Sequence, residues 1–149
     1  MPVSEICNRE VIVVQRETTV NEAAKLMRQH HVGSVVVVEE RKGVRVPVGI
    51  VTDRDLVVEV MAPELVQMVI TVGDIMGPKL VTVQDGMGIY ESIRYMRVEG
   101  VRRLPVVDSR GGLIGILALD DLLELLAEEL LELSRLVKHE QKKESMTRL

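Results

Sequence analysis

The sequence has no Phe and no Trp, and Tyr90 and Tyr95 are its only aromatic residues. The core must therefore be aliphatic, and a single-strand nucleic-acid binder that stacks bases on aromatic rings is excluded as a leading interpretation. The net charge is -4 and the basic residues are spread along the chain, so the footprint of a duplex binder is missing as well. His30 and His31 are adjacent and His139 lies far along the chain, which gives no metal-ligand spacing. We expect neither a nucleic-acid partner nor a metal site.

Cysteine and long apolar runs are also scarce. Cys7 stands alone, which excludes an internal disulfide and a cysteine-based zinc site within one chain and indicates a reducing compartment. The N-terminus has no signal-peptide pattern, and no stretch approaches the ~20 apolar residues that span a bilayer. Nucleophile motifs and Walker loops are absent. The expectation is a cytoplasmic protein that is not an enzyme, has no catalytic cofactor and does not enter membranes.

A tandem repeat organises the residues that are present. Residues 49–55 read Gly-Ile-Val-Thr-Asp-Arg-Asp, and residues 115–121 read Gly-Ile-Leu-Ala-Leu-Asp-Asp. An offset of 69 pairs similar residues from Val3 with Val72 to Val37 with Val106, and the offset falls to 66 across a hairpin that is three residues longer in the first half. Repeats of about 60 residues are marginal alone, so the halves should fold against each other as one pseudo-symmetric domain.

Each half reads as a strand, a helix, two strands joined by a hairpin, and a second helix. Thr18 or Thr19 with Glu22 forms a candidate capping box at the first helix. The predicted fold is α/β, with two β-α-β-β-α units at residues 3–62 and 72–127, a connector at 63–71 and a C-terminal helical extension and tail at 128–149. The predicted elements are 11–14, 19–29, 35–38, 46–51 and 56–61 in the first half, then 80–83, 88–98, 104–107, 113–117 and a helix from 119 in the second.

The last helix is longer than its counterpart and reaches about residue 143. Its apolar residues recur at steps of three and four, which makes a narrow seam suited to a partner helix, although Leu123, Leu125 and Leu131 widen it. We therefore predict docking or dimerisation; the alternative is a helix that folds back on its own core. The charged stretch 138–148 is expected to fray into solvent. The seam comprises Leu119, Leu122, Leu126, Leu130, Leu133 and Val137.

The paired units, each ending in Gly-aliphatic-aliphatic-(Thr/Ser)-x-x-Asp, resemble the cystathionine beta-synthase (CBS) domain pair, or Bateman module, over about residues 3–127. Val-Gly-Asp-Ile-Met at 72–76 and Gly-Val-Arg-Arg-Leu-Pro-Val-Val-Asp at 100–108 support the likeness. The resemblance implies a regulatory module that binds adenosine-containing ligands in clefts between its two units: AMP, ADP, ATP, sometimes S-adenosylmethionine or NAD. It also implies two chains meeting as a flat disc of four units.

Thr52 and Asp55 are the first candidate site residues. Thr52 lies where a strand ends and a helix begins, so it can cap the helix, and Asp55 lies in the first turn near the positive end of the dipole. That structural role could explain both residues. A carboxylate can also accept hydrogen bonds from both hydroxyls of a ribose. By resemblance, these two positions contact ribose and nearby phosphate, and we expect a nucleotide site here.

The second motif departs from the pattern because Ala118 replaces the threonine, which removes a cap and a ligand hydroxyl. Asp121 alone would make a poorer site. A nucleotide held there would have its phosphate end facing Gly33 and Ser34, which offer no charge.

Arg102 and Arg103 lie at the start of the second unit's middle strand, where the first unit has Gly33 and Ser34. By resemblance, the phosphate end of a nucleotide held by Asp55 points toward this position, and guanidinium groups match phosphate oxygens. Adjacent strand residues face opposite ways, so one arginine is expected at the phosphates and the other could be a surface charge. Arg54 is a further candidate, with a solvent-facing helix residue as the alternative.

The adenine base would need an apolar slot. The resemblance suggests Ile12, Val13, Met27 and Val35 for it, and each of these is equally an ordinary core residue.

The leading hypothesis is a stand-alone adenine-nucleotide sensor that forms a homodimer and transmits its ligand state to a regulated partner protein. The alternative is a ligand-independent dimerisation scaffold that uses the repeat core and the leucine-rich helix. Enzymatic activity is the weakest of the three hypotheses, because nothing resembles a nucleophile with its base. The sugar and adenine contacts are shared among the adenosyl ligands, so the sequence does not choose between them.

Overall fold

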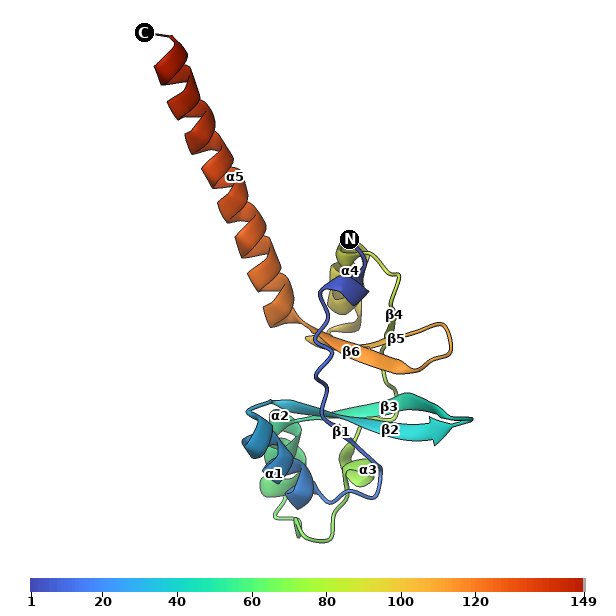
Figure 1. Cartoon of the computed structure of the whole chain (residues 1–149). Helices are drawn as coiled ribbons and strands as arrows, with labels where there is room; N and C mark the ends of the chain where they lie inside the picture. Colours follow the sequence, from blue (N-terminus) through green and yellow to red (C-terminus); the bar gives the residue numbers. More distant parts are fainter. Residues whose placement is uncertain (149) are drawn as a thin grey trace. The chain divides into compact units, whose positions relative to one another are not determined.

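The computed structural model describes residues 1–148 and divides the chain into two units, Met1–Leu117 and a second unit from Ala118 onward (Figure 1). The first unit holds both halves of the repeat. The second is the long helix α5 (Leu119–Thr147).

The predicted order of elements is confirmed in both halves. Each half forms a three-stranded sheet, ordered β1-β2-β3 in the first and β4-β5-β6 in the second. In both sheets the short first strand runs parallel to the middle strand. The elements of the first half are β1 (Val13–Val14), α1 (Val20–His30), β2 (Ser34–Arg41), β3 (Val44–Thr52) and α2 (Asp53–Leu56). Those of the second are α3 (Val72–Ile75), β4 (Val83–Gln84), α4 (Ile89–Glu99), β5 (Arg103–Val107) and β6 (Leu113–Ala118).

Several predicted boundaries differ: the strands predicted at 35–38 and 46–51, for example, extend over Ser34–Arg41 and Val44–Thr52. The first strands are only two residues long, because β1 and β4 each pair with the middle strand at two positions. The helix predicted at 56–61 begins earlier, at Asp53, and continues as a π-helical segment, Val57–Met61. At α1 the Thr19 side chain accepts a hydrogen bond from the backbone N–H of Glu22, which confirms Thr19 rather than Thr18 as the cap.

The prediction that residues 138–148 fray is wrong, since α5 continues without a break to Thr147. Lys, Glu, Gln and Arg are good helix formers, and they dominate this stretch. Arg148 also pairs with Glu144 one turn earlier, which supports the last turn. The boundary proposed between residues 127 and 128 therefore lies inside one continuous helix.

The two halves exchange their opening segments. The N–H groups of Val3 and Ser4 donate to the carbonyls of Met87 and Asp85 in the second half. In turn, the N–H groups of Val72 and Gly73 of the second half donate to the carbonyls of Thr18 and Arg16 in the first. These bonds are related by the offset of 69 found in the sequence. Each half thus completes the other, which confirms the expectation that the halves fold together.

The glycine that begins each closing motif lies under such an exchanged segment. A Cβ on Gly49 would meet the Met76 side chain, and one on Gly115 would lie 2.9 Å from the Asn8 carbonyl oxygen, beside Cys7. Asn8 and Ile116 also exchange two backbone hydrogen bonds. The crossing backbone thus leaves no room for a larger side chain at Gly115.

Buried valines fill the sheet of the first half. Val35, Val36 and Val37 of β2 are all fully buried, so both faces of this middle strand are covered. One core cluster comprises Val14, Ala23, Met27, Val35, Val37, Val51 and Val72. Val72 belongs to the opening segment of the second half, so the exchange contributes apolar contacts as well as hydrogen bonds.

Gly73 provides a test of the exchange. A Cβ there would lie 2.8 Å from the Arg16 carbonyl oxygen, whereas one on Gly77 would meet nothing within 4 Å. We expect Gly73→Ala to lower the free energy of unfolding by roughly 1–3 kcal/mol, because backbone must shift. Gly77→Ala is the matched control and should stay within about 0.5 kcal/mol of the wild type. Urea denaturation measures both, and equal stability of the two variants would contradict the exchange.

Candidate functional site

A reciprocal capping box closes the first half. The Thr52 hydroxyl oxygen accepts from the Asp55 N–H at 3.1 Å, and Asp55 Oδ2 accepts from the Thr52 N–H at 2.8 Å. The predicted structural role of both residues is therefore confirmed. The box involves Oδ2 of the carboxylate and the acceptor side of the hydroxyl. Asp55 Oδ1 and the hydroxyl proton of Thr52 lie outside it, and both side chains are half-buried.

A second box of the same kind, which the sequence reading missed, precedes α3. Thr71 and Asp74 exchange the same two bonds, at 3.2 and 2.9 Å. The signal was available, because residues 71–74 repeat the Thr-x-x-Asp spacing of residues 52–55. Since this pair lies outside the closing motifs, a Thr-x-x-Asp box by itself does not indicate a ligand site.

The surroundings of Thr52 distinguish the first box. Ser34 is paired with Thr52 across β2 and β3, and the Asp53 N–H donates to the Gly33 carbonyl at 3.0 Å. A Cβ on Gly33 would lie 3.2 Å from Nη2 of Arg103 and 3.3 Å from Oδ2 of Asp53. A guanidinium from the second half thus reaches the strand end where α2 begins.

The two neighbouring arginines differ in their setting. Arg103 is half-buried at the first position of β5, while Arg102 precedes the strand and is exposed. Arg54 is exposed in the short helix α2. Of the three predicted arginines, Arg103 is the one that the structure brings to Gly33.

Asp53 was not among the predicted site residues. Its side chain is exposed and its Oδ1 accepts a hydrogen bond from the Arg54 N–H. Nothing in the sequence separates it from an ordinary first-turn carboxylate. Its nearness to the Arg103 guanidinium follows from the packing of the two halves, which the sequence pattern does not specify.

The residues predicted for the adenine slot are mostly core residues. Val35 is 0% exposed and Met27 is 7% exposed, and both belong to the core cluster, with Ile12 packed against it. The Ile12 carbonyl accepts from the Val36 N–H, and Val13 pairs with Val36. Ile12 and Val13 are partly exposed, so their side chains are more open to a ligand than those of Met27 and Val35.

The second closing motif keeps the backbone but loses the hydroxyl. Ala118 has φ -115° and ψ 152°, close to the -107° and 166° of Thr52. Asp121 still accepts from the Ala118 N–H at 3.2 Å, so half of the box remains. The Asp121 N–H has lost the side-chain acceptor that Thr52 offers to Asp55.

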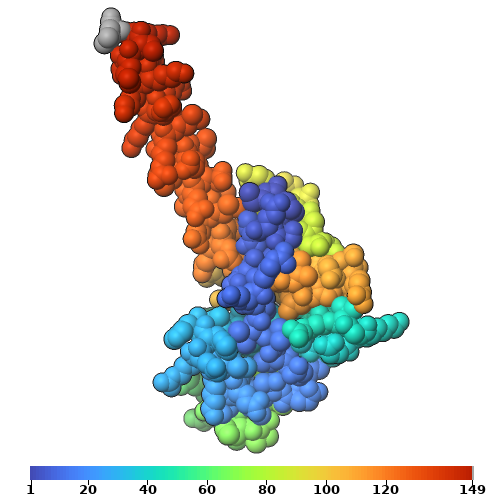
Figure 2. All heavy atoms as spheres, in the orientation of Figure 1, coloured from blue at the N-terminus to red at the C-terminus, as the bar shows by residue number. Residues whose placement is uncertain are grey.

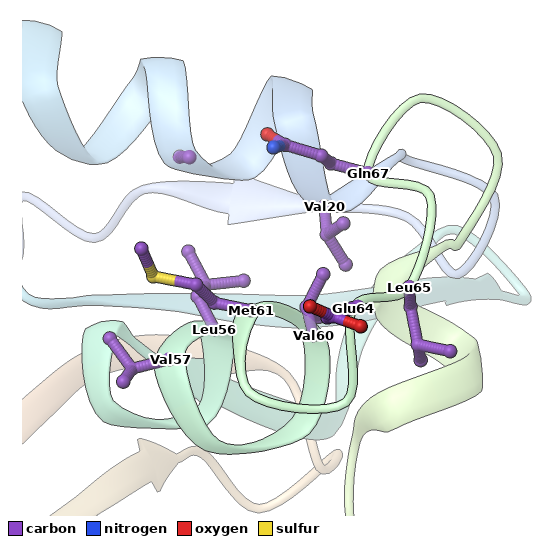
Figure 3. Close-up of a pocket in the computed structure, with 9 residues that line it drawn as sticks. Val20, Leu56, Val57, Val60, Met61, Glu64, Leu65 and Gln67 are labelled. Carbon is purple, nitrogen blue, oxygen red and sulfur yellow. The ribbon is translucent and has the colours of Figure 1, made fainter.

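An apolar hollow of about 390 Å³ lies between α1, the π-helical segment and the connector that follows (Figure 3). Glu64 and Gln67 are the only polar residues among those that line it. It contains none of the predicted nucleotide-binding residues and no cationic group, so it does not suit a phosphate. Its apolar lining consists of Val20, Ala24, Leu56, Val57, Val60, Met61 and Leu65.

Other chemistry is sparse in residues 1–148. There is no group of three or more metal-ligating side chains, and no helix is long and apolar enough to cross a membrane. On the β2–β3 hairpin, hydrogen bonds from Arg16 and Arg41 hold the pKa of Glu39 below its ordinary value. These three residues form a surface cluster that includes no predicted site residue.

Comparison with known proteins matches one family model to both halves. The model, described as CBS domain, covers residues 3–62 and 72–128. An uncharacterised protein of Methanopyrus kandleri is 39% identical over 123 residues, which is 83% of this chain and 61% of that protein. The chain therefore spans less than two thirds of that relative.

Solved structures show the same architecture. A putative signal-transduction protein with CBS domains from Burkholderia ambifaria matches with a TM-score of 0.74 at 29% identity, over 85% of this chain and 93% of that chain. The CBS domain pair of protein MJ0100, in complex with 5'-methylthioadenosine and S-adenosyl-L-methionine, matches with a TM-score of 0.74 at 23% identity, over 87% and 98%. The predicted fold of two paired units is thus confirmed.

The broken symmetry of the caps gives a paired prediction. Thr52→Ala removes the acceptor of the Asp55 N–H and should lower stability by about 1 kcal/mol. Ala118→Thr supplies the missing acceptor at the same backbone angles and should raise stability by about 0.5–1 kcal/mol. Urea denaturation, with hydrogen exchange at the Asp121 N–H, measures both effects. Unchanged protection of that N–H in Ala118→Thr would show that the restored cap does not form.

Proposed function

Because the chain belongs to the CBS domain family, we propose that it is a non-catalytic regulatory module that binds an adenosine nucleotide of the AMP, ADP or ATP type beside α2. The observation that supports this most is the approach of Arg103 to Gly33, next to the Thr52–Asp55 box. A sugar-binding carboxylate and a phosphate-binding cation then border one strand end. Neither group alone would distinguish the site from a helix cap.

Each group has a separate role in the proposal. Asp55 accepts the ribose hydroxyls through the carboxylate oxygen outside the box, and Thr52 donates its hydroxyl proton toward the sugar or phosphate. Arg103 binds the phosphate oxygens. Arg102, next to Arg103 in the sequence, and Arg54, next to Asp55, are further exposed charges. Ile12 and Val13 supply the more open part of the base slot, and Met27 and Val35 support it from the core.

Asp53 and Arg103 carry opposite charges beside Gly33, and these charges favour different adenosyl ligands. A phosphate would favour Arg103, whereas the sulfonium of S-adenosylmethionine would favour the carboxylate of Asp53. The complex of the MJ0100 pair with two adenosyl ligands is consistent with binding of this class, although that protein resembles the chain in fold alone. NAD carries phosphates and would use Arg103 as well.

The exchanged segments suggest how the ligand state would be transmitted to a partner protein. A ligand bound between Asp55 of the first half and Arg103 of the second stabilises one relative packing of the halves. The shift is limited by the difference in ligand affinity between the two packings. A homodimer partner and a regulated protein would read this change. A poorer second site at Asp121 is part of the same proposal.

A ligand-independent dimerisation scaffold is the second candidate. The exposed leucines of α5 favour it, because they would serve assembly without any ligand. It predicts no shift of the melting temperature with any adenosyl ligand, whereas the sensor predicts a shift that rises with ligand concentration.

Asp55 and Asp74 offer a matched test, since both occupy the same position of a capping box. We expect Asp55→Asn to weaken AMP or ATP binding by roughly 10- to 100-fold, because a charge-assisted hydrogen bond to the ribose is lost. Asp74→Asn should perturb its cap similarly and leave the affinity unchanged. Calorimetric titration measures the affinities, with Asp121→Asn expected to have a smaller effect. Equal affinity of the Asp55 and Asp74 variants would rule out the site.

Arg103 tests the phosphate end of the ligand. Arg103→Gln should weaken the binding of ATP or AMP by at least about 10-fold while leaving that of adenosine nearly unchanged, because only the phosphate contact is removed. Arg102→Gln is the control, since its side chain is exposed. Melting-temperature shifts with the two ligands give the comparison. A larger effect from Arg102 would reverse the assignment of the two arginines.

A further inference from the structure

Helix α5 exposes an apolar seam of its own. From Leu126 to Arg148 every residue is exposed, and the helix is drawn with its side chains in orange to red in Figure 2. When Leu123 is taken as position a of a heptad, the a and d positions are apolar from Leu119 to Val137. The next two such positions are Glu140 and Glu144, which end the seam. The a residues are Leu123, Leu130 and Val137, and the d residues are Leu119, Leu126 and Leu133.

The exposure of these side chains is large. Leu130 is 69% exposed, Leu133 is 59% exposed and Val137 is 54% exposed. Leu131 and Leu136, which are 50% and 60% exposed, lie beside this seam, but the a and d positions are apolar in an unbroken series. Alternation of three and four over this length suits the knobs-into-holes packing of a second helix.

The residues at the e and g positions, which flank the seam, indicate which helix can pack against it. In a parallel pair each g residue faces the e residue five places later in the partner. Here Glu129 would face Ser134 of the partner subunit, and Leu136 would face Gln141 of the partner subunit. Neither pair joins like charges. Most other carboxylates of the first half of α5 fall at outward positions: Asp121, Glu124, Glu128 and Glu132.

An antiparallel pair fits less well. The arrangement that keeps all six apolar layers sets Leu126 against Leu130 of the partner subunit, and it brings the two copies of Glu129 together on one side. Moving the helices by one heptad avoids this but sets Leu123 against a glutamate, Glu140 of the partner subunit. The seam and its flanks are therefore self-complementary in the parallel arrangement.

We propose that α5 pairs with α5 of a second copy of this chain as a parallel, in-register coiled coil from Leu119 to Val137. The inference gives the proposed homodimer an interface and an orientation. It rests on that homodimer but not on nucleotide binding. Beyond Val137, Glu140 and Glu144 face their own copies in the partner helix, and the repulsion of these like charges ends the coiled coil.

Disulfide cross-linking of the full chain tests the proposal. In a parallel pair, two copies of Val137→Cys lie in one layer, whereas in the antiparallel pair they are about 27 Å apart along the axis. Val137→Cys should cross-link at least tenfold faster than Lys138→Cys, the matched outward control. Both variants retain Cys7, so the wild-type chain corrects for its reaction.

A second substitution shows that the seam is responsible. Leu130→Gln added to Val137→Cys should slow cross-linking at least tenfold, and Leu131→Gln, at an exposed outward position, should leave it unchanged. Equal rates for Val137→Cys and Lys138→Cys, or equal effects of the two glutamines, would overturn the proposal. Cross-links between Leu123→Cys and Leu133→Cys chains would show antiparallel pairing instead. Asp55→Asn added to Val137→Cys should cross-link like Val137→Cys alone, so failure of either proposal is recognised separately.

Discussion

The exchange of opening segments is the constraint on which the rest of the Met1–Leu117 unit depends. The opening segment of each half donates backbone hydrogen bonds to carbonyls of the other half, from Val3 to Met87 and from Val72 to Thr18. Val72 also enters the core of the first half. A half of about 60 residues is only marginally stable alone. The exchange makes separation of the halves costly in hydrogen bonds as well as in apolar area. The relative position of the two halves is thereby defined, and with it the approach of Arg103 to Gly33.

The packing of the two halves explains the residue types of the closing motifs. The glycine accommodates a crossing segment, the aliphatic pair fills the sheet, and the Thr-x-x-Asp box turns the chain from β3 into α2. All of these are requirements of folding. The ligand site proposed at this point would reuse groups that the turn already holds in place, so little further ordering would be needed on binding.

The sequence predicted the fold well because its signals there are local and repeated. The offset of 69, the period of the helices and the Thr19 cap each specify a neighbourhood of a few residues. The site was predicted less completely. Asp53 became a neighbour of Arg103 only through packing between halves, and the depth at which Val35 is buried depends on both faces of its strand. The tail is helical although its charge predicts fraying, because Lys, Glu and Arg favour helix when they pair at three or four residues, as Arg148 does with Glu144.

Comparison of the three caps separates folding from function. Thr71 and Asp74 have the full box, and Arg16 of the first half crosses beside it at Gly73, but its guanidinium pairs with Glu39. Ala118 with Asp121 has half a box. Only the box of Thr52 and Asp55 adjoins the strand end that Arg103 reaches. If helix capping alone determined the closing motifs, a threonine would not be expected specifically in the motif that Arg103 approaches. A ligand can bias the packing of the two halves only if its sugar and phosphate ends are held by different halves. An intact capping box beside a guanidinium from the opposite half is the arrangement that such a ligand would require.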